Sequence, residues 1–167
     1  MSRELTPVEL VAMLAAGPQR LAELTVGRPT TQVHTAPALG EWSANDVLAH
    51  LRACADVWGE AIATILTQER PTIRAINPRT WMERTDYREQ EFQASLRAFT
   101  EQRVALVATL QALAPEAWAR EAKVTGAGRP LVRTVHGYAH GLAIHERPHL
   151  KQIARIIQDK DAIISSE

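Results

Sequence analysis

Apolar residues recur along most of the chain at intervals of three and four residues, which is the period of an amphipathic α-helix. Four stretches show this pattern: a segment that begins at Thr6, and residues 43–66, 86–113 and 132–158. No stretch alternates convincingly with a period of two, which is the pattern of a half-buried strand. The pattern therefore predicts an all-α protein, built as a four-helix bundle without strands.

Two of these helices begin with recognisable capping residues. Thr6 can cap the first helix, with Glu9 three residues later to complete a capping box. Ser43 and Asp46 offer the same arrangement for the second helix. Pro18 removes a backbone donor, so we expect it to interrupt or kink the first helix.

Proline and glycine mark the connecting segments. Residues 27–40 have no helical period and are predicted to form a loop. Residues 69–85, with Pro71 and Pro78, predict a long crossover between helices 2 and 3 that contains one short helix at most. Residues 124–130 contain a G-x-G sequence, but without a preceding strand this favours a plain turn over a phosphate-binding loop.

Length, charge and cysteine content narrow the class of protein. A chain of 167 residues is long enough for one domain, over residues 1–167, with its own core. Its 19 basic and 19 acidic side chains cancel, so neither nucleic acid nor a membrane is an expected partner. The single cysteine excludes an internal disulfide, and the first residues lack the apolar run of a signal peptide. We therefore expect a cytoplasmic protein.

Three histidines are predicted to face the inside of the bundle. Residues on a helix advance by about 100° each, so His145 and His149 share one face of the last helix. Apolar residues of that helix lie on the same face. His50 lies beside the apolar stripe of the second helix. By the same geometry His136 and His140 fall on the opposite side of the last helix and are expected to be solvated.

Two interpretations account for inward histidines. Each ring could be satisfied by a local hydrogen bond, which is the ordinary state of a single buried histidine. Three inward imidazoles favour a shared divalent cation, because one ion satisfies three nitrogens that would otherwise need separate partners. Three protein ligands also leave coordination positions open, as catalytic sites do. We therefore predict a metal site of His50, His145 and His149.

Residues 145–149 also spell H-E-x-x-H, the motif of zinc proteases. Pro148 inside the motif removes a helical hydrogen bond, and no further histidine follows it, so a protease is disfavoured. Glu146 and His149 form the E-x-x-H element of di-iron bundles, but the sequence contains no second copy of it. A mononuclear site is the better prediction.

Three further residues are candidates for catalytic roles, namely Glu146, Asp46 and Arg103. Either carboxylate could accept a proton, although Asp46 could equally orient a ligand, meet Arg103 or serve only the helix start. Arg103 lies within an apolar stripe, where an unpaired charge is unfavourable. Its guanidinium could pair with an anionic residue, extend to solvent, or bind an anionic group of the substrate. Cys54, one turn after His50, could be a fourth ligand or a nucleophile, but a small buried hydrophobic residue is its commoner role.

The histidine segments resemble signatures of the DinB-like superfamily. Trp42-Ser43 followed by residues 47–51 resembles the second-helix signature, and residues 143–153 resemble that of the last helix. Phe99, Arg103 and the leucine-rich run after them resemble the third helix. The resemblance covers roughly residues 10–158 and implies a DinB-like four-helix bundle. Pro148 departs from the pattern.

This superfamily includes YfiT-like metal hydrolases and bacterial thiol-dependent S-transferases. The resemblance implies a divalent metal, with zinc or nickel ahead of iron or manganese, and a homodimer. It also implies a small-molecule substrate. Our first functional expectation is transfer of a low-molecular-weight thiol. The alternatives are hydrolysis of an amide or ester and, third, a stress-associated protein that binds a metal or ligand without turnover.

Overall fold

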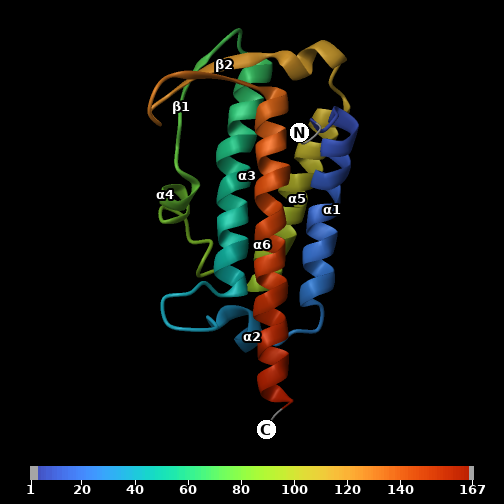
Figure 1. The fold of residues 1–167 in the computed structure, drawn as a ribbon, viewed down its shortest axis with the longest axis vertical. Coiled ribbons are helices and arrows are strands. Elements are labelled where there is room, and N and C mark those ends of the chain that lie inside the picture. The colour runs from blue at the N-terminus through green and yellow to red at the C-terminus, as the bar shows by residue number, and fades with distance from the viewer. Residues whose placement is uncertain (1–3, 166–167) are drawn as a thin grey trace.

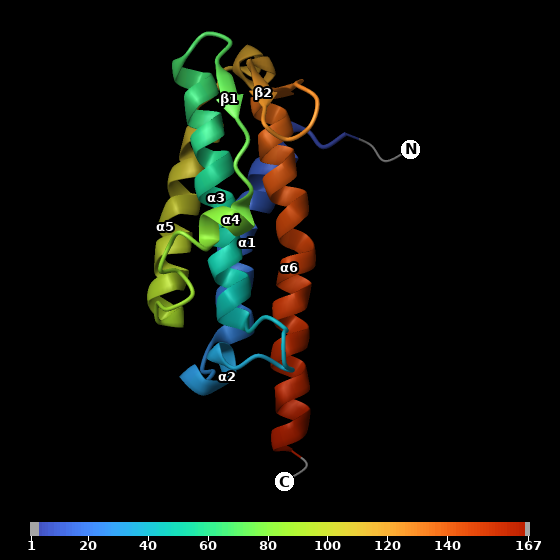
Figure 2. The same ribbon diagram turned by 90° about the vertical axis from the view of Figure 1, so that its left-hand side faces the viewer.

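Four long helices form a bundle in the computed structural model, which describes residues 4–165 (Figure 1). Helices α1 and α6 run in one direction, and α3 and α5 run in the other (Figures 1 and 2). Around the bundle, α6 packs against α1 and α3, and α5 packs against the same two helices from the other side. Their bounds are Pro7–Thr25 for α1, Ala44–Thr67 for α3, Phe92–Gln111 for α5 and Val135–Ile164 for α6. The predicted helical bundle is thus confirmed.

The two predicted capping boxes are present. The Thr6 hydroxyl accepts a hydrogen bond from the backbone N–H of Glu9 at 3.3 Å, and the Glu9 carboxylate accepts one from the Thr6 backbone at 2.8 Å. Ser43 and Asp46 make the same reciprocal pair at the start of α3. These bonds satisfy donors that have no partner inside the helix, and so they fix where each helix begins. Pro18 lies inside α1 without ending it.

Helix α5 begins at Phe92, six residues later than its pattern predicted. The side chain of Asn45 on α3 donates to the backbone carbonyls of Arg88 at 2.9 Å and Gln90 at 3.3 Å. These carbonyls therefore bind α3 instead of continuing a helix. The Glu91 carboxylate then caps α5 by accepting from the backbone N–H of Ala94 at 3.0 Å.

A small three-stranded sheet covers one end of the bundle, so the prediction that the chain has no strands is wrong. Its strands are β1 (Thr72–Arg74), β2 (Glu121–Thr125) and β3 (Leu131–Thr134), in the order β1-β2-β3. Strand β1 is parallel to β2, and β2 is antiparallel to β3. Strands of three to five residues are too short for a period of two to be recognised.

The predicted turn over residues 124–130 joins two of these strands. Gly126 and Gly128 both have positive φ, at 86° and 84°, in the connection between β2 and β3. Glycine adopts this conformation without steric cost, which explains the G-x-G sequence as a turn. Because β3 extends to Thr134, helix α6 begins only at Val135, and it continues past the expected end at residue 158.

The connecting segments carry three short helices. Helix α2 (Thr30–His34) lies within the predicted loop, and the 3-10 helix Pro115–Ala119 follows α5. Residues 68–91 return along the outside of α3 and contain β1 and helix α4 (Pro78–Met82) (Figure 2). The Asp56 carboxylate on α3 accepts hydrogen bonds from Trp81 Nε1 at 3.0 Å and from the Tyr87 hydroxyl at 2.7 Å. These bonds hold α4 against the bundle.

Two apolar clusters fill the interior at different levels. One cluster lies toward the sheet and includes Leu14, Ile62 and Leu142, and the other lies toward α2 and includes Leu48 and Ile153. Between them is a polar layer, which we define by His50, Arg103, His145, Glu146 and His149. Within residues 4–165, no helix is both long enough and apolar enough to cross a membrane.

Candidate metal centre

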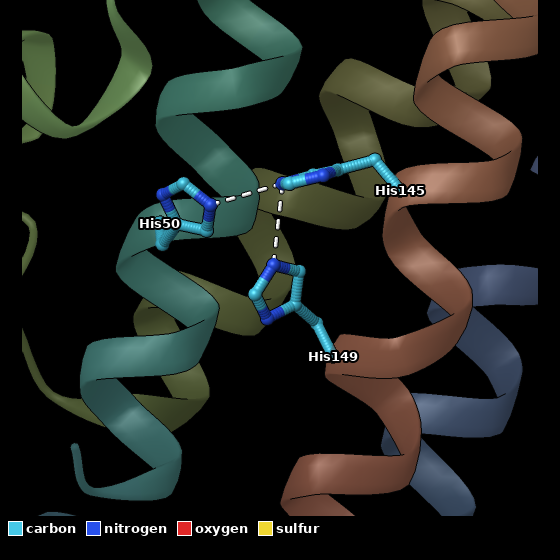
Figure 3. A group of neighbouring side chains, drawn as sticks. All are labelled: His50, His145 and His149. Carbon is cyan, nitrogen blue, oxygen red and sulfur yellow. Dashed lines mark hydrogen bonds between the residues drawn. The ribbon is translucent and has the colours of Figure 1, made fainter. Parts of the chain in front are cut away.

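The three predicted ligands converge between α3 and α6 (Figure 3). His145 Nε2 lies 3.0 Å from His50 Nε2 and 3.2 Å from His149 Nε2. Within the described part of the chain, this is the one group of three or more potential ligand residues whose atoms all lie within 4.8 Å of one another. His50 is buried, and His145 and His149 are half-buried. The structure therefore brings together, from two helices, the residues that the sequence predicted.

The spacing of these nitrogens fits a metal ion better than a hydrogen-bonded cluster. Two nitrogens that each lie about 2.1 Å from one ion, at angles of about 90–110°, are about 3.0–3.4 Å apart. A neutral imidazole Nε2 carries either one proton or one lone pair. His145 Nε2 therefore cannot make good hydrogen bonds to both His50 and His149, although it lies near both.

Burial keeps two of the rings in the form that binds metals. It lowers the pKa of His50 to about 4, with smaller contributions from the charges of His149, His145 and Arg79. Burial also lowers the pKa of His145, followed by the charges of His149 and Arg79. Both imidazoles are therefore neutral at neutral pH, with a lone pair available for an ion.

Neighbouring side chains fix the orientation of the rings. Gln152 Oε1 lies 3.1 Å from His149 Nδ1, where it can accept a hydrogen bond from that nitrogen, and His149 Nε2 points toward the other rings. The Trp42 ring lies 5.3 Å from that of His50, and the Trp58 ring lies 5.3 Å from that of His145. Gln152 was not predicted as a site residue, although its position three residues after His149 on one helix face could have indicated this contact.

Cys54 lies beside the site but outside the group of ligand atoms. Its Sγ is 3.6 Å from His50 Nε2. Burial, and then the charge of Glu146, raise the pKa of this thiol to about 12. Cys54 is therefore a neutral, buried thiol at neutral pH, which matches the commonest of its three predicted roles, a small buried hydrophobic residue.

Glu146 and Arg103 are bound to each other inside the bundle. Arg103 Nη2 donates to Glu146 Oε2 at 2.6 Å, and Arg103 Nη1 donates to the backbone carbonyl of Leu14 at 3.1 Å. Both side chains are almost completely buried. This ion pair links α6 to α5 across the interior of the bundle, and the bond to Leu14 also reaches α1. Arg103 thus has the anionic partner that its apolar surroundings required.

Asp46 lies at the start of α3 and takes part in the helix cap. In addition to Ser43, its carboxylate accepts a hydrogen bond from Arg88 Nε at 2.7 Å. Burial raises the pKa of Asp46, but the bonds from Arg88 and Ser43 together outweigh it and leave the pKa below its usual value. Asp46 is therefore an ionised capping residue and does not contact Arg103.

The other two histidines of α6 lie away from the centre, as predicted, but they are half-buried and not fully solvated. His136 Nε2 lies 2.8 Å from the backbone oxygen of Leu5, and its ring stacks with that of His140 at 6.4 Å. The segment before α1 thus contacts His136. No helical pattern could have predicted this contact, because it comes from residues distant in sequence.

The sequence profile of the DinB superfamily matches residues 13–153, and the chain therefore belongs to this superfamily. This finding confirms the resemblance seen in the two histidine segments. No curated protein matches the chain in sequence.

Two solved structures share the fold. YfiT from Bacillus subtilis, described as "a probable metal-dependent hydrolase with an unusual four-helix bundle topology", aligns with a TM-score of 0.81 and 19% sequence identity. This alignment covers 96% of the present chain and 93% of YfiT. A protein from Streptococcus pneumoniae aligns with a TM-score of 0.66 and 14% identity, over 98% of the present chain and 94% of the other. At these identities the likeness shows the fold alone.

Proposed function

We propose that this protein is a divalent-metal-dependent hydrolase that acts on a small molecule with an amide or ester bond. The observation that carries the proposal is the convergence of three histidine nitrogens within 4.8 Å. The description of YfiT as a probable metal-dependent hydrolase with the same fold supports hydrolysis over other metal-dependent chemistry.

His50, His145 and His149 would hold the ion. A divalent metal with open coordination positions lowers the pKa of water and polarises a carbonyl oxygen. His145 and His149 are half-buried, so a small substrate can reach the site from solvent. Gln152 holds His149 in the ligating tautomer. Zinc and nickel suit a set of three imidazoles, with iron and manganese as alternatives.

We assign supporting roles to the three charged residues that the sequence put forward for catalysis. Glu146 and Arg103 neutralise each other, so Glu146 is poorly placed to act as a general base. Asp46 is engaged by Ser43 and Arg88 at the helix start. Their contacts favour positioning of α6 and α3 around the centre over contact with a substrate.

The test is a screen of amides and esters with protein loaded anaerobically with zinc, nickel, iron or manganese. We expect turnover that needs the metal and falls by at least about a hundredfold in His145→Ala. Metal-loaded protein that hydrolyses none of these substrates would contradict the proposal.

Thiol transfer, our first expectation from the sequence, could use the same three-histidine site with a thiol in place of water. Bacillithiol, mycothiol and glutathione are therefore included in the screen, each paired with an electrophilic substrate. Metal-dependent consumption of a thiol, without hydrolysis of any amide or ester, would favour transfer over hydrolysis.

A further inference from the structure

Arg79 is a cation held at the edge of the three-histidine site. It lies at the start of α4, where its backbone N–H donates to Asn77 Oδ1 at 2.9 Å. Its guanidinium carbon lies 5.1 Å from the centre of the Trp42 ring, which in turn lies 5.3 Å from the His50 ring. Among the ion pairs and side-chain hydrogen bonds of residues 4–165, none involves the Arg79 guanidinium. Its donors are therefore available to a ligand.

Arg79 and His149 line the same pocket, which has a volume of about 620 Å³. Arg155 adds a second cation, and Glu41 and Asp159 are the two carboxylates of the lining. Within the described chain, none of these four charged side chains forms an ion pair with another. No carboxylate of the pocket thus neutralises the charge of Arg79 by direct contact. An unpaired guanidinium of this kind can bind an anionic group of a ligand.

A second pocket adjoins the site on the side toward the sheet, with a volume of about 180 Å³. Trp58 forms part of its wall, and the Trp58 ring lies 5.3 Å from that of His145. The pocket with Arg79 extends the other way, past Gln152 toward the end of α6. Most residues that line the second pocket are apolar, among them Trp58, Ala61, Ile73, Ile76, Val124 and Tyr138. Four charged residues, Asp56, Glu60, Arg74 and Arg133, also line it.

We propose that Arg79 recognises a carboxylate on the substrate, while the pocket beside Trp58 receives an apolar group on the other side of the bond that is cleaved. The substrate class is then an N-acyl amino acid with an apolar acyl chain. This inference rests on the proposed hydrolase function and specifies its substrate. Arg79 offers a planar pair of donors that match a carboxylate, and the apolar pocket stabilises the acyl chain by removing it from water.

The reaction balances without a further reactant. The oxygen of one water molecule forms a bond to the acyl carbon, and the bond between that carbon and the amide nitrogen breaks. The products are the fatty acid and the free amino acid. One water proton goes to the departing nitrogen, and the acid releases the other to solvent at neutral pH.

This inference is tested by ligand binding to metal-free protein. A bound metal ion would itself bind the carboxylate of the ligand and so compete with Arg79. Calorimetry would compare N-octanoylglycine with its uncharged analogue N-octanoylglycinamide. We expect the carboxylate to bind about tenfold more tightly, the effect of one charge-assisted hydrogen-bonded contact. Arg79→Gln should remove this preference, while Arg84→Gln, an exposed arginine of the same segment, should keep it.

Equal affinities in the unmodified protein, no binding of either compound, or an undiminished preference in Arg79→Gln would each overturn the role of Arg79. The apolar pocket is tested by N-acetylglycine, which should bind at least about tenfold more weakly than N-octanoylglycine. Equal binding of these two would overturn the role of that pocket.

Activity then separates this inference from the proposed function. If the metal-loaded protein binds N-octanoylglycine through Arg79 but hydrolyses neither it nor any other amide or ester, hydrolysis fails and anion recognition stands. If it hydrolyses uncharged esters or amides, and Arg79→Gln leaves the charge preference unchanged, hydrolysis stands and this inference fails.

Discussion

At the scale of single residues, the metal centre depends on imidazoles that are kept neutral. His50 is buried among apolar neighbours and next to two other rings, so a proton on it costs more free energy than in water. The same effect acts on His145. A neutral ring donates its lone pair to a cation without first losing a proton, so these residues are prepared for metal binding at neutral pH.

This burial predicts the pH dependence of stability in metal-free protein. The folded-state pKa of His50, about 4, lies below its ordinary value of 6.5. Between these values the unfolded chain binds more protons, so the free energy of unfolding should fall as pH decreases from about 6.5 to 4. Over this pH range, the free energy of unfolding of His50→Gln, measured in urea, should fall by about 2 kcal/mol less than that of the unmodified protein. An identical pH profile in this variant would contradict the neutral state of His50.

Cys54 is predicted to react slowly. Its pKa of about 12, against an ordinary value of 9.0, lowers the thiolate fraction about a thousandfold at pH 8. Labelling of folded, metal-free protein with a thiol reagent should therefore be slower than labelling of the urea-unfolded protein by at least that factor. Equally rapid labelling of the two states would show that the thiol is exposed and ionised, and would restore a nucleophilic role.

The sequence could predict that the three histidines lie together because helical spacing determines which side chains share a face. His145 and His149 are four residues apart, and His50 is next to an apolar stripe. The pair between Glu146 and Arg103 was not predicted, because it depends on how α6 and α5 are rotated against each other. Periodicity within one helix does not contain this information.

At the scale of elements, a buried ion pair sets the position of α6. Glu146 immediately follows His145, so the bond to Arg103 links α6 to α5 across the core while the neighbouring histidines converge with His50 of α3. Gly17 on α1 makes room for this arrangement. A Cβ atom at Gly17 would lie 1.7 Å from Glu146 Oε1.

Gly17→Ala should therefore destabilise the bundle, because Glu146 must move from Arg103 while both groups remain buried. We expect a loss of about 2–4 kcal/mol in the free energy of unfolding. Gly59→Ala on α3 is the matched control, since a Cβ there meets nothing within 4 Å. The free energy of unfolding of this control should rise by up to about 1 kcal/mol, because alanine has a higher helix propensity than glycine. Similar stability of both variants in urea unfolding would contradict the constraint at Gly17.

The helices could be predicted from the sequence, but several boundaries and the sheet could not. The boxes at Thr6 and Ser43 fixed two helix starts through local bonds. The start of α5 depends on Asn45, which is more than forty residues away from the carbonyls it binds. Strand β1 pairs with β2 across a similar separation. Contacts between distant segments leave no periodic pattern in the sequence.

At the scale of the whole molecule, the polar layer divides one bundle into two apolar halves. Each half is stabilised by burial of aliphatic and aromatic side chains, whereas the layer between them contains the ion pair and the three histidines. Helix α4 and the return segment 68–91 lie along the outside of α3, the helix that carries His50 (Figure 2). The stable halves thus support a site whose own groups are costly to bury.

The metal centre is tested most directly by the metal content of protein purified without a nickel column, measured by mass spectrometry after dialysis against a mixture of divalent metals. We expect about one ion per chain in the unmodified protein, and less than about one tenth of that in His145→Ala with the fold retained. Metal-free unmodified protein, or an undiminished metal content in His145→Ala, would contradict a metal centre formed by these three histidines.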